Sequence, residues 1–203
     1  MAGGSGTIVM INGAPTDNNA KLFKQGAHKV FDASTLKIGK EYDTPNWSPA
    51  EAQDEMDQAI TALGKANIAG VYAANDGTAG GAIAAMKAAG LNPAQIPTTG
   101  QDADLAGIQR IVAGEQYMTI YKAIKPQAED AATAAVNLLQ GKELGIETTP
   151  VNNGTSDVPS SIYDPVAVTK ENVADTIVAD GFWTPAEICT GAYAKACADA
   201  GIQ

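Results

Sequence analysis

Five polar or aromatic side chains stand in short segments where strand-like runs of the sequence end. They are two amides, one indole, one carboxylate and one ammonium group, contributed by Asn19, Asn75, Trp47, Asp102 and Lys122. Amides and carboxylates pair with hydroxyl groups, a lysine donates to hydroxyl or ring oxygens, and an indole covers the C–H face of a sugar ring. The set therefore predicts a site for a neutral polyol. Its two charged members are the expected anchors because hydrogen bonds to charged groups are the strong ones.

Each of these positions also has a purely structural interpretation. Asp17 or Asn18 is an ordinary helix cap, and Asp102 with Asp104 would stabilise a helix N-terminus through the helix dipole. Trp47 precedes a helix start and fits a hydrophobic staple, while Lys122 fits a solvated surface charge. The functional interpretation therefore depends on whether the fold brings all five to one place.

Strand-like and helix-like runs alternate along the first two thirds of the chain. The strand-like runs are Thr7–Ile11, Leu36–Tyr42, Gly70–Ala73, Gln95–Thr99 and Tyr117–Tyr121, and the helical patterns cover residues 17–31, 49–66, 78–89, 103–113 and 124–140. A capping box starts at Ser48, and Gly90, Gly114 and Gly141 stand at C-terminal cap positions. The alternation predicts an α/β fold, a three-layer parallel sheet with helices on both faces. Ligands of such sheets bind at the carboxyl ends of the strands, so the five side chains are expected to share one edge.

The alternation ends at Gly141. Residues 141–165 are rich in Gly, Pro, Asn, Ser and Thr and predict a crossing segment without regular structure. A short strand (166–168), a helix near 171–179 and a second capping box at Thr184, opening a last helix, follow. Cys189 and Cys197 would lie about 12 Å apart on one straight helix. A disulfide between them requires that helix to break, with Gly191 as the candidate position, and free thiols are the alternative.

Composition and residue types argue against several classes of function. The 203-residue chain carries a net charge of −10, with 13 Lys and Arg against 23 Asp and Glu, which disfavours nucleic acid and anionic membrane surfaces. It has neither a signal-peptide pattern nor an apolar run of the ~20 residues that a membrane span needs. The single histidine, His28, is expected on the solvated side of a helix. Without a catalytic set or metal-spaced cluster, we expect no enzyme, no metal and no cofactor.

Longer motifs carry a resemblance to a known family. The segments PTDNNAKLF, AANDGTAGGAI, TGQDADLAGIQRIVAG, YMTIYK and VNNGTSDVPS resemble the D-xylose-binding proteins of bacterial ABC importers, which are type I periplasmic sugar-binding proteins. The likeness runs from residue 7 to about residue 182. It implies capture of D-xylose or a similar monosaccharide outside the cytoplasm and delivery to an ABC permease. It also places the family's pentose contacts on the same five positions, with Asn75 as a ligand residue and Asp76 as the helix cap.

The resemblance covers only the C-terminal lobe of a receptor that has two lobes. It implies a start and Gly/Ser linker (residues 1–6), a sugar-binding lobe (7–122), a hinge crossing with a segment that would pack on the missing N-terminal lobe (123–165), and a return strand with C-terminal helices (166–203). The site would then be partial. The segments that would pack on the missing lobe are expected either to fold back onto their own lobe or to pair with a second copy of the chain through the face left by that lobe. The alternative function is a sensory or protein-interaction module derived from such a lobe.

Overall fold

The computed structural model describes residues 5–202, which fall into two units. The first unit comprises the chain up to Tyr121 together with the chain from Ala167 onward, and the second comprises Lys122–Val166. Residues 1–4 of the expected linker lie outside the described residues, and regular structure already begins at Gly6. Within residues 5–202, no helix has the length and apolar character that a membrane crossing requires.

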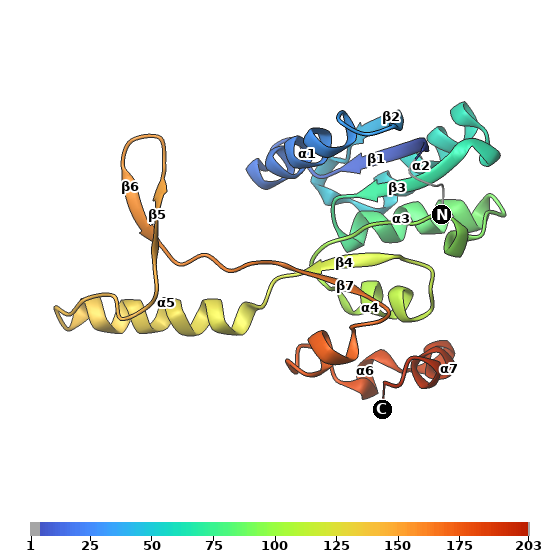
Figure 1. Ribbon diagram of the computed structural model, residues 1–203. Helices are drawn as coiled ribbons and strands as arrows, with labels where there is room; N and C mark the ends of the chain where they lie inside the picture. Colours follow the sequence, from blue (N-terminus) through green and yellow to red (C-terminus); the bar gives the residue numbers. More distant parts are fainter. Residues whose placement is uncertain (1–4, 203) are drawn as a thin grey trace. The chain divides into compact units, whose positions relative to one another are not determined.

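The first unit is built on a parallel sheet whose strands lie in the order β2–β1–β3 (Figure 1). The central strand β1 (Gly6–Asn12) is parallel to both β2 (Leu36–Asp43) and β3 (Ile68–Ala73). Strand β4 (Met118–Tyr121) pairs with β7 (Val166–Thr169). The parallel arrangement of β1, β2 and β3 brings the loops that follow them to one edge of the sheet.

The segment between β3 and β4 corrects one predicted strand. A strand over residues 95–99 was expected, but Pro93–Gln95 forms a 3-10 turn, and Thr98 makes an isolated parallel bridge to Val71. The segment is still held on both sides, because the Val71 amide donates to the Pro97 carbonyl (2.9 Å) and the Tyr117 amide donates to the Thr98 carbonyl (3.0 Å). Pro97 has no N–H to donate, which limits the length of a regular ladder here.

Helices cover both faces of the sheet in the first unit. They are α1 (Asn18–Phe31), α2 (Pro49–Leu63), α3 (Asp76–Ala88) and α4 (Leu105–Val112), with 3-10 turns at Pro45–Trp47 and Lys65–Asn67. Helices α2 and α3 pack on the face that carries Val9, Ile11 and Val71. The next residue, Tyr72, points to the opposite face, where its ring lies 5.9 Å from that of Phe31 in α1. The predicted three-layer α/β fold is confirmed.

Most predicted helix ends agree with the structure to within three residues. Ser48 caps α2 by accepting from the Glu51 amide, and the predicted glycine caps at 90, 114 and 141 all have positive φ. The second helix ends at Leu63, three residues early, because Gly64 (φ 82°) terminates it. Gly64 is therefore the C-terminal cap of α2, and the helical pattern of the sequence did not indicate it.

The C-terminal stretch departs from the single helix that the capping box at Thr184 predicted. The box is present, but the helix it opens, α6 (Pro185–Ile188), is followed by a 3-10 turn (Gly191–Tyr193) and then α7 (Ala194–Asp199). The break occurs where Gly191 has φ 53°. It brings the Cα atoms of Cys189 and Cys197 to 5.7 Å, and the two form a disulfide. The expected helix near 171–179 is a π-type turn over Ala174–Val178.

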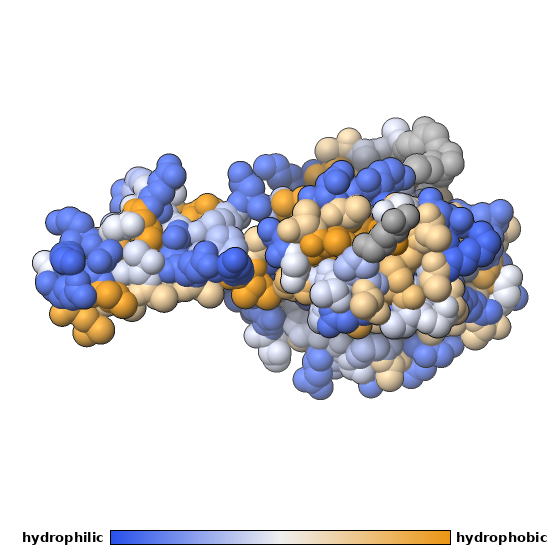
Figure 2. All heavy atoms as spheres, turned by 90° about the horizontal axis from the view of Figure 1, so that it is seen from below, coloured by the Kyte–Doolittle hydropathy of each residue, from blue (hydrophilic) through white to orange (hydrophobic). Residues whose placement is uncertain are grey.

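The second unit has very little buried surface. It contains α5 (Ile124–Leu139) and an antiparallel hairpin of β5 (Thr149–Asn152) and β6 (Asp157–Ser160), so the prediction that residues 141–165 lack regular structure was wrong. No residue of α5 is buried, and Leu139 is 89% exposed. Figure 2 shows apolar residues on the surface of this unit among hydrophilic ones. A helix whose apolar residues stay exposed lacks a packing partner within its own unit.

Candidate functional site

The loop after β2 places an indole at the carboxyl edge of the sheet. Asn46 and Trp47 both adopt left-handed backbone conformations, with φ of 54° and 56°. The half-buried Trp47 side chain donates from Nε1 to Asp17 Oδ2 (3.2 Å), and its ring lies directly over Gly13. A Cβ at Gly13 would come within 2.0 Å of that ring, so only glycine permits this position. The hydrophobic-staple interpretation is therefore not needed to explain Trp47.

The cap of α3 is Asn75 and not Asp76. Asn75 is the N-cap of α3: its Oδ1 accepts from the Thr78 amide (2.8 Å), and the Thr78 hydroxyl completes a capping box. Asp76 is 1% exposed and faces the interior, so the prediction that Asp76 is the cap was wrong. Within the described residues, Nδ2 of Asn75 makes no hydrogen bond, so the cap leaves this half-buried amide a donor for a ligand.

The loop before α4 carries Asp102 in a backbone conformation that L-residues rarely adopt. Asp102 has φ 98° and the following Ala103 has φ 55°. The Asp102 amide donates to the Ile120 carbonyl (2.9 Å), which fixes the loop against β4. Asp104 occupies the N-cap position of α4 without a side-chain cap bond, so the structural interpretation of its carboxylate remains the interaction with the helix dipole. Strained backbone of this kind concentrates at ligand sites.

A chain of contacts joins these loops into one edge. Asp17 connects the first two, because its Oδ1 accepts from the Asn19 amide (2.8 Å) while its Oδ2 accepts from the indole of Trp47. Asp17 is thus also the cap of α1, which decides between the two candidates, Asp17 and Asn18. Gly77 lies against Pro49, next to the indole loop, with a distance of 3.6 Å from Cγ to a Cβ built there. The Asp76 amide donates to the Gln101 carbonyl (2.9 Å), which ties the Asn75 loop to the Asp102 loop.

The structure therefore places four of the five predicted residues on the linked loops of the first unit. Asn19 is exposed at the start of α1, and Trp47, Asn75 and Asp102 are half-buried. The fifth, Lys122, is exposed, directly follows β4 and opens the second unit, so its place in a common site stays a prediction. Two amides, an indole and a carboxylate suit a small neutral ligand with several hydroxyl groups.

Reasoning from the sequence did not predict the role of Asp76 as a buried support of the site. Its carboxylate accepts three hydrogen bonds, from Gln116 Nε2 (2.7 Å), Thr119 Oγ1 (3.0 Å) and the Asp104 amide (2.9 Å). Burial raises the pKa of Asp76 to about 6, although these donors and Arg110 favour its charged form. The only local signal was an acidic residue beside Asn75, which is equally typical of a cap.

A second polar cluster lies at the end of β1 and on β2. Glu41 accepts from Asn12 Nδ2 (3.0 Å), lies 2.8 Å from the ammonium of Lys24, and lies 3.1 Å from His28 Nε2. The hydrogen bond to Glu41 raises the pKa of His28. His28 is half-buried against β2, so its predicted position on the solvated side of α1 was wrong. Among the described residues, Asn12 Oδ1 is buried without a hydrogen-bond partner.

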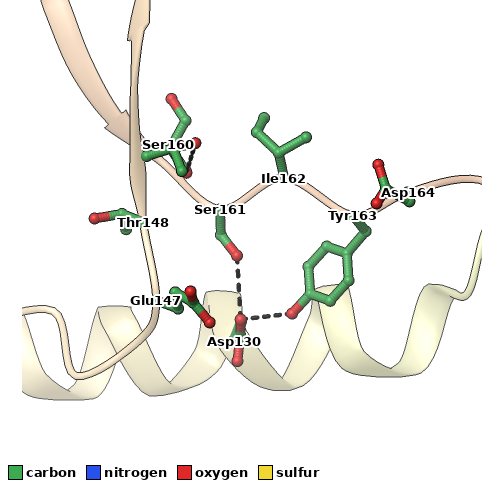
Figure 3. Close-up of a pocket in the computed structure, with 9 residues that line it drawn as sticks. Asp130, Glu147, Thr148, Ser160, Ser161, Ile162, Tyr163 and Asp164 are labelled. Carbon is green, nitrogen blue, oxygen red and sulfur yellow. Dashed lines mark hydrogen bonds between the residues drawn. The ribbon is translucent and has the colours of Figure 1, made fainter.

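Two cavities are lined by none of the five predicted residues. The second unit has a polar pocket of about 450 Å³ between α5 and the strand ends, where Ser161 and Tyr163 both donate to Asp130 (Figure 3). The first unit has an apolar groove of about 400 Å³ lined by residues of α1, β3 and β4, among them Phe23, Tyr72 and Met118. Neither contains the amide, indole and carboxylate combination. Within residues 5–202, no group of three His, Cys, Asp or Glu residues is placed to hold a metal ion.

Comparisons with known proteins agree with this architecture. Residues 1–143 match the model of a periplasmic binding protein domain. The chain is 44% identical to the D-xylose-binding periplasmic protein of Escherichia coli (strain K12) over 187 residues, which cover 90% of this chain and 56% of that protein. The chain thus spans little more than half the length of this relative.

Solved structures with bound sugars share the fold. A carbohydrate transporter solute-binding protein from Chloroflexus aurantiacus, in complex with D-glucose, superposes with a TM-score of 0.77 at 29% identity, covering 91% of this chain and 62% of that one. An ABC transporter solute-binding protein from Clostridium phytofermentans with bound β-D-glucose gives 0.76 at 26% identity, covering 93% and 62%. The parallel sheet, the family match and the extent of identity lead to one conclusion: this chain belongs to the periplasmic binding protein family.

Proposed function

We propose that the chain binds a monosaccharide, with D-xylose as the first candidate, through the loops that carry Asn19, Trp47, Asn75 and Asp102. The observation that carries this proposal is the clustering of left-handed non-glycine residues. Within residues 5–202 there are four, and they fall as two pairs, Asn46–Trp47 and Asp102–Ala103, on two of the predicted ligand loops. Backbone of this kind costs roughly 1–3 kcal/mol per residue and persists where a site requires it.

The chemistry of the four side chains supports a sugar more than a charged ligand. The Asn75 amide donates and the Asp102 carboxylate accepts, which is the pairing that adjacent hydroxyls require. Trp47 offers a flat apolar face for ring C–H groups. The name of the relative from Escherichia coli, which is 44% identical, makes xylose the first sugar to test. Lys122 is proposed as a further contact, donating to a ring or hydroxyl oxygen.

The site is proposed to be one half of a complete receptor site. The chain covers about 56% of the length of its xylose-binding relative, and a receptor of two lobes surrounds its ligand from both sides. Affinity of this chain alone is then expected in the millimolar range, because only part of the sugar is desolvated. In the whole protein the proposed role is capture outside the cytoplasm and delivery to an ABC permease, without catalysis.

An amide NMR titration with D-xylose and D-glucose, with mannitol as an acyclic control, tests the proposal. We expect saturable shifts on the loops around Asn19, Trp47, Asn75 and Asp102, and their loss in Trp47→Ala. Tyr117→Ala is the matched control, because Tyr117 is an exposed aromatic residue immediately before β4. It lies at the start of that strand, whereas the predicted ligand residue Lys122 follows its end. Absence of sugar-specific shifts at tens of millimolar would contradict the proposal and favour a protein-interaction module.

Self-association remains a separate proposal. The α5 helix exposes Val136, Leu138 and Leu139, each at least half exposed, and such residues favour burial against a partner. Light scattering across a concentration series measures this directly. A mass that stays at that of one chain at all concentrations would contradict self-association without affecting the sugar proposal.

A further inference from the structure

Asp76 lies at the centre of the contacts that hold the Asp102 loop. Its carboxylate is almost fully buried, and Gln116 donates to Oδ1 while Thr119 and the Asp104 amide donate to Oδ2. The surrounding backbone is fitted closely to it. A Cβ would come within 2.1 Å of the carboxylate at Gly100 and within 2.4 Å at Gly107. The fold therefore leaves room for this carboxylate by using glycine on two sides.

The left-handed pair Asp102–Ala103 is bracketed by hydrogen bonds that lead back to Asp76. The Asp104 amide donates to Asp76 Oδ2 (2.9 Å), and the Ala103 amide donates to the hydroxyl of Thr119 (3.3 Å), which itself donates to the same oxygen. On the other side of the pair, the Gln101 carbonyl accepts from the Asp76 amide. Asp76 thus holds a carbonyl before the strained pair and an amide after it. Two further bonds act on the pair itself, from the Asp102 amide to the Ile120 carbonyl (2.9 Å) and from the Trp183 indole to the Ala103 carbonyl (2.8 Å).

Arg110 and Gln116 complete a ring of polar contacts around Asp76. Arg110 Nη2 donates to the Asp76 carbonyl (2.7 Å), and its Nε donates to Gln116 Oε1 (3.0 Å). This orients the amide of Gln116 so that its Nε2 faces Asp76. The side chains of Gln116 and Thr119 therefore both donate to the Asp76 carboxylate. A residue at position 76 must supply acceptors for them. Burial nevertheless raises the pKa of Asp76, so the fold retains a carboxylate where its charge is disfavoured.

We propose that Asp76 is a positioning residue of the sugar site, which holds Asp102 and Ala103 in their left-handed conformation and so aims the Asp102 carboxylate at the ligand. The proposal rests on the proposed function. Asp76 does not itself face the ligand edge, because the adjacent Asn75 caps α3 and Asp76 turns inward. Asn75 thus offers the ligand a hydrogen-bond donor, and the next residue, Asp76, orients the Asp102 carboxylate, which is the acceptor.

The test compares Asp76→Asn with Glu41→Gln, using amide hydrogen exchange without sugar and a xylose titration. Both substitutions remove the charge of a hydrogen-bonded carboxylate, but Glu41 contacts Asn12, Lys24 and His28, which are outside the Asp102 loop. In Asp76→Asn we expect faster exchange at Asp104 and Ala103 and about tenfold or greater loss of xylose affinity. Glu41→Gln should leave both quantities near wild type.

A second pair of variants covers the case in which Asp76→Asn does not fold. Thr119→Val removes the hydroxyl that links Ala103 to Asp76, while Thr119→Ser keeps it. Faster exchange at Ala103 and weaker binding in Thr119→Val, with rescue in Thr119→Ser, supports the proposal. Equal behaviour of the two variants overturns it, because a merely structural role for the side-chain volume would not depend on the hydroxyl.

The failure of this inference is distinguishable from the failure of the proposed function. If wild-type chain shows no sugar-specific shifts, the proposed function fails, and with it the positioning role. If wild-type chain binds xylose but the exchange of Ala103 and Asp104 in Asp76→Asn matches that of wild type, the inference alone is overturned. Loop loosening together with unchanged xylose affinity also overturns it.

Discussion

Two loops at the sheet edge carry the same kind of backbone strain but are held in different ways. The Trp47 loop is fixed by its own side chain, which covers Gly13 and donates to Asp17, a residue at the protein surface. The Asp102 loop is held by Asp76, whose buried carboxylate accepts from the Asp104 amide. Loops at one edge of a sheet can therefore be held in position either by contacts at the protein surface or by a buried residue of the core. Loss of the polar contact at Asp17 should therefore act mainly on the Trp47 loop, whereas loss of the polar contacts of Asp76 should also change folding stability.

The largest expected effect comes from Asp102→Gly. Loss of the carboxylate should weaken xylose binding by about tenfold or more. Glycine also tolerates φ 98°, so the free energy of unfolding should rise by about 1 kcal/mol. Asp102→Ala is the control, since it removes the same carboxylate without relieving the backbone. Equal unfolding free energies of these two variants, measured by urea denaturation, would show that the loop is not strained.

Gly13→Ala should be next in size and should act on the Trp47 loop. A Cβ at this position overlaps the indole ring, so the ring must move, at a cost of about 1–3 kcal/mol in stability. Xylose affinity should fall several-fold, with chemical-shift changes centred on Trp47. Gly26→Ala is the matched control, because nothing lies within 4 Å of a Cβ there and the residue is inside α1. That variant should be slightly more stable than wild type.

The pH dependence of stability distinguishes the core contact from the surface ones. Burial raises the pKa of Asp76 from 3.8 to about 6, so the folded state holds a proton that the unfolded state releases in this range. The free energy of unfolding should therefore fall as pH rises from about 4 through 6. Asp76→Asn should flatten this part of the profile. A profile with the same slope in both proteins would mean that Asp76 titrates as in an unfolded chain.

His28 adds a smaller contribution of the same sign at higher pH. Its hydrogen bond to Glu41 raises its pKa above 6.5, so its stabilisation is present below that value and is lost as pH rises through the raised folded value. His28→Gln should remove this contribution without altering the profile between pH 4 and 6. Urea denaturation at intervals of half a pH unit separates the two ranges.

The smallest expected effect is that of Asp17→Asn. Asparagine has one acceptor oxygen where Asp17 has two. It can still cap α1 through the Asn19 amide but then loses the bond from the Trp47 indole, so stability should fall by only about 0.5–1 kcal/mol. Xylose affinity should fall by no more than about threefold, because the indole still packs over Gly13 and only one part-buried hydrogen bond is lost. A loss as large as that of Asp76→Asn would remove the distinction between a surface-held and a core-held loop.

Local patterns predicted the elements and the edge well. Ser48, Asp17 and the box at Thr184 are caps whose partners lie within three residues, so the sequence window contains both members of each pair. The same holds for the glycine that ends α3, Gly90, whose positive φ follows from its place after the last apolar residue. The α/β alternation was then enough to predict that the loops after the parallel strands β1, β2 and β3 lie at one edge of the sheet.

The predictions that were wrong or left open depended on features outside the local sequence. Asn75 and Asp76 are equally good caps by residue type, and the choice between them depends on Gln116 and Thr119, which are 40 and 43 residues from Asp76. Residues 95–99 had strand composition, yet Pro97 and the 3-10 turn before it shortened the pairing. The sequence left a disulfide and free thiols open for Cys189 and Cys197, and the helix break at Gly191, the candidate position, decided for the disulfide. In each case a distant contact or a backbone turn decided between two locally acceptable states.

The most direct test of the account is the set of nuclear Overhauser contacts between bound xylose and the protein. We predict contacts from ring protons of the sugar to the indole protons of Trp47 and to the Nδ2 protons of Asn75 in the wild-type chain. Contacts to Phe23 and Met118 of the apolar groove, or to Tyr163 in the second unit, with none to Trp47, would place the sugar elsewhere. That result would contradict the central claim that the strained loops of the sheet edge form the binding site.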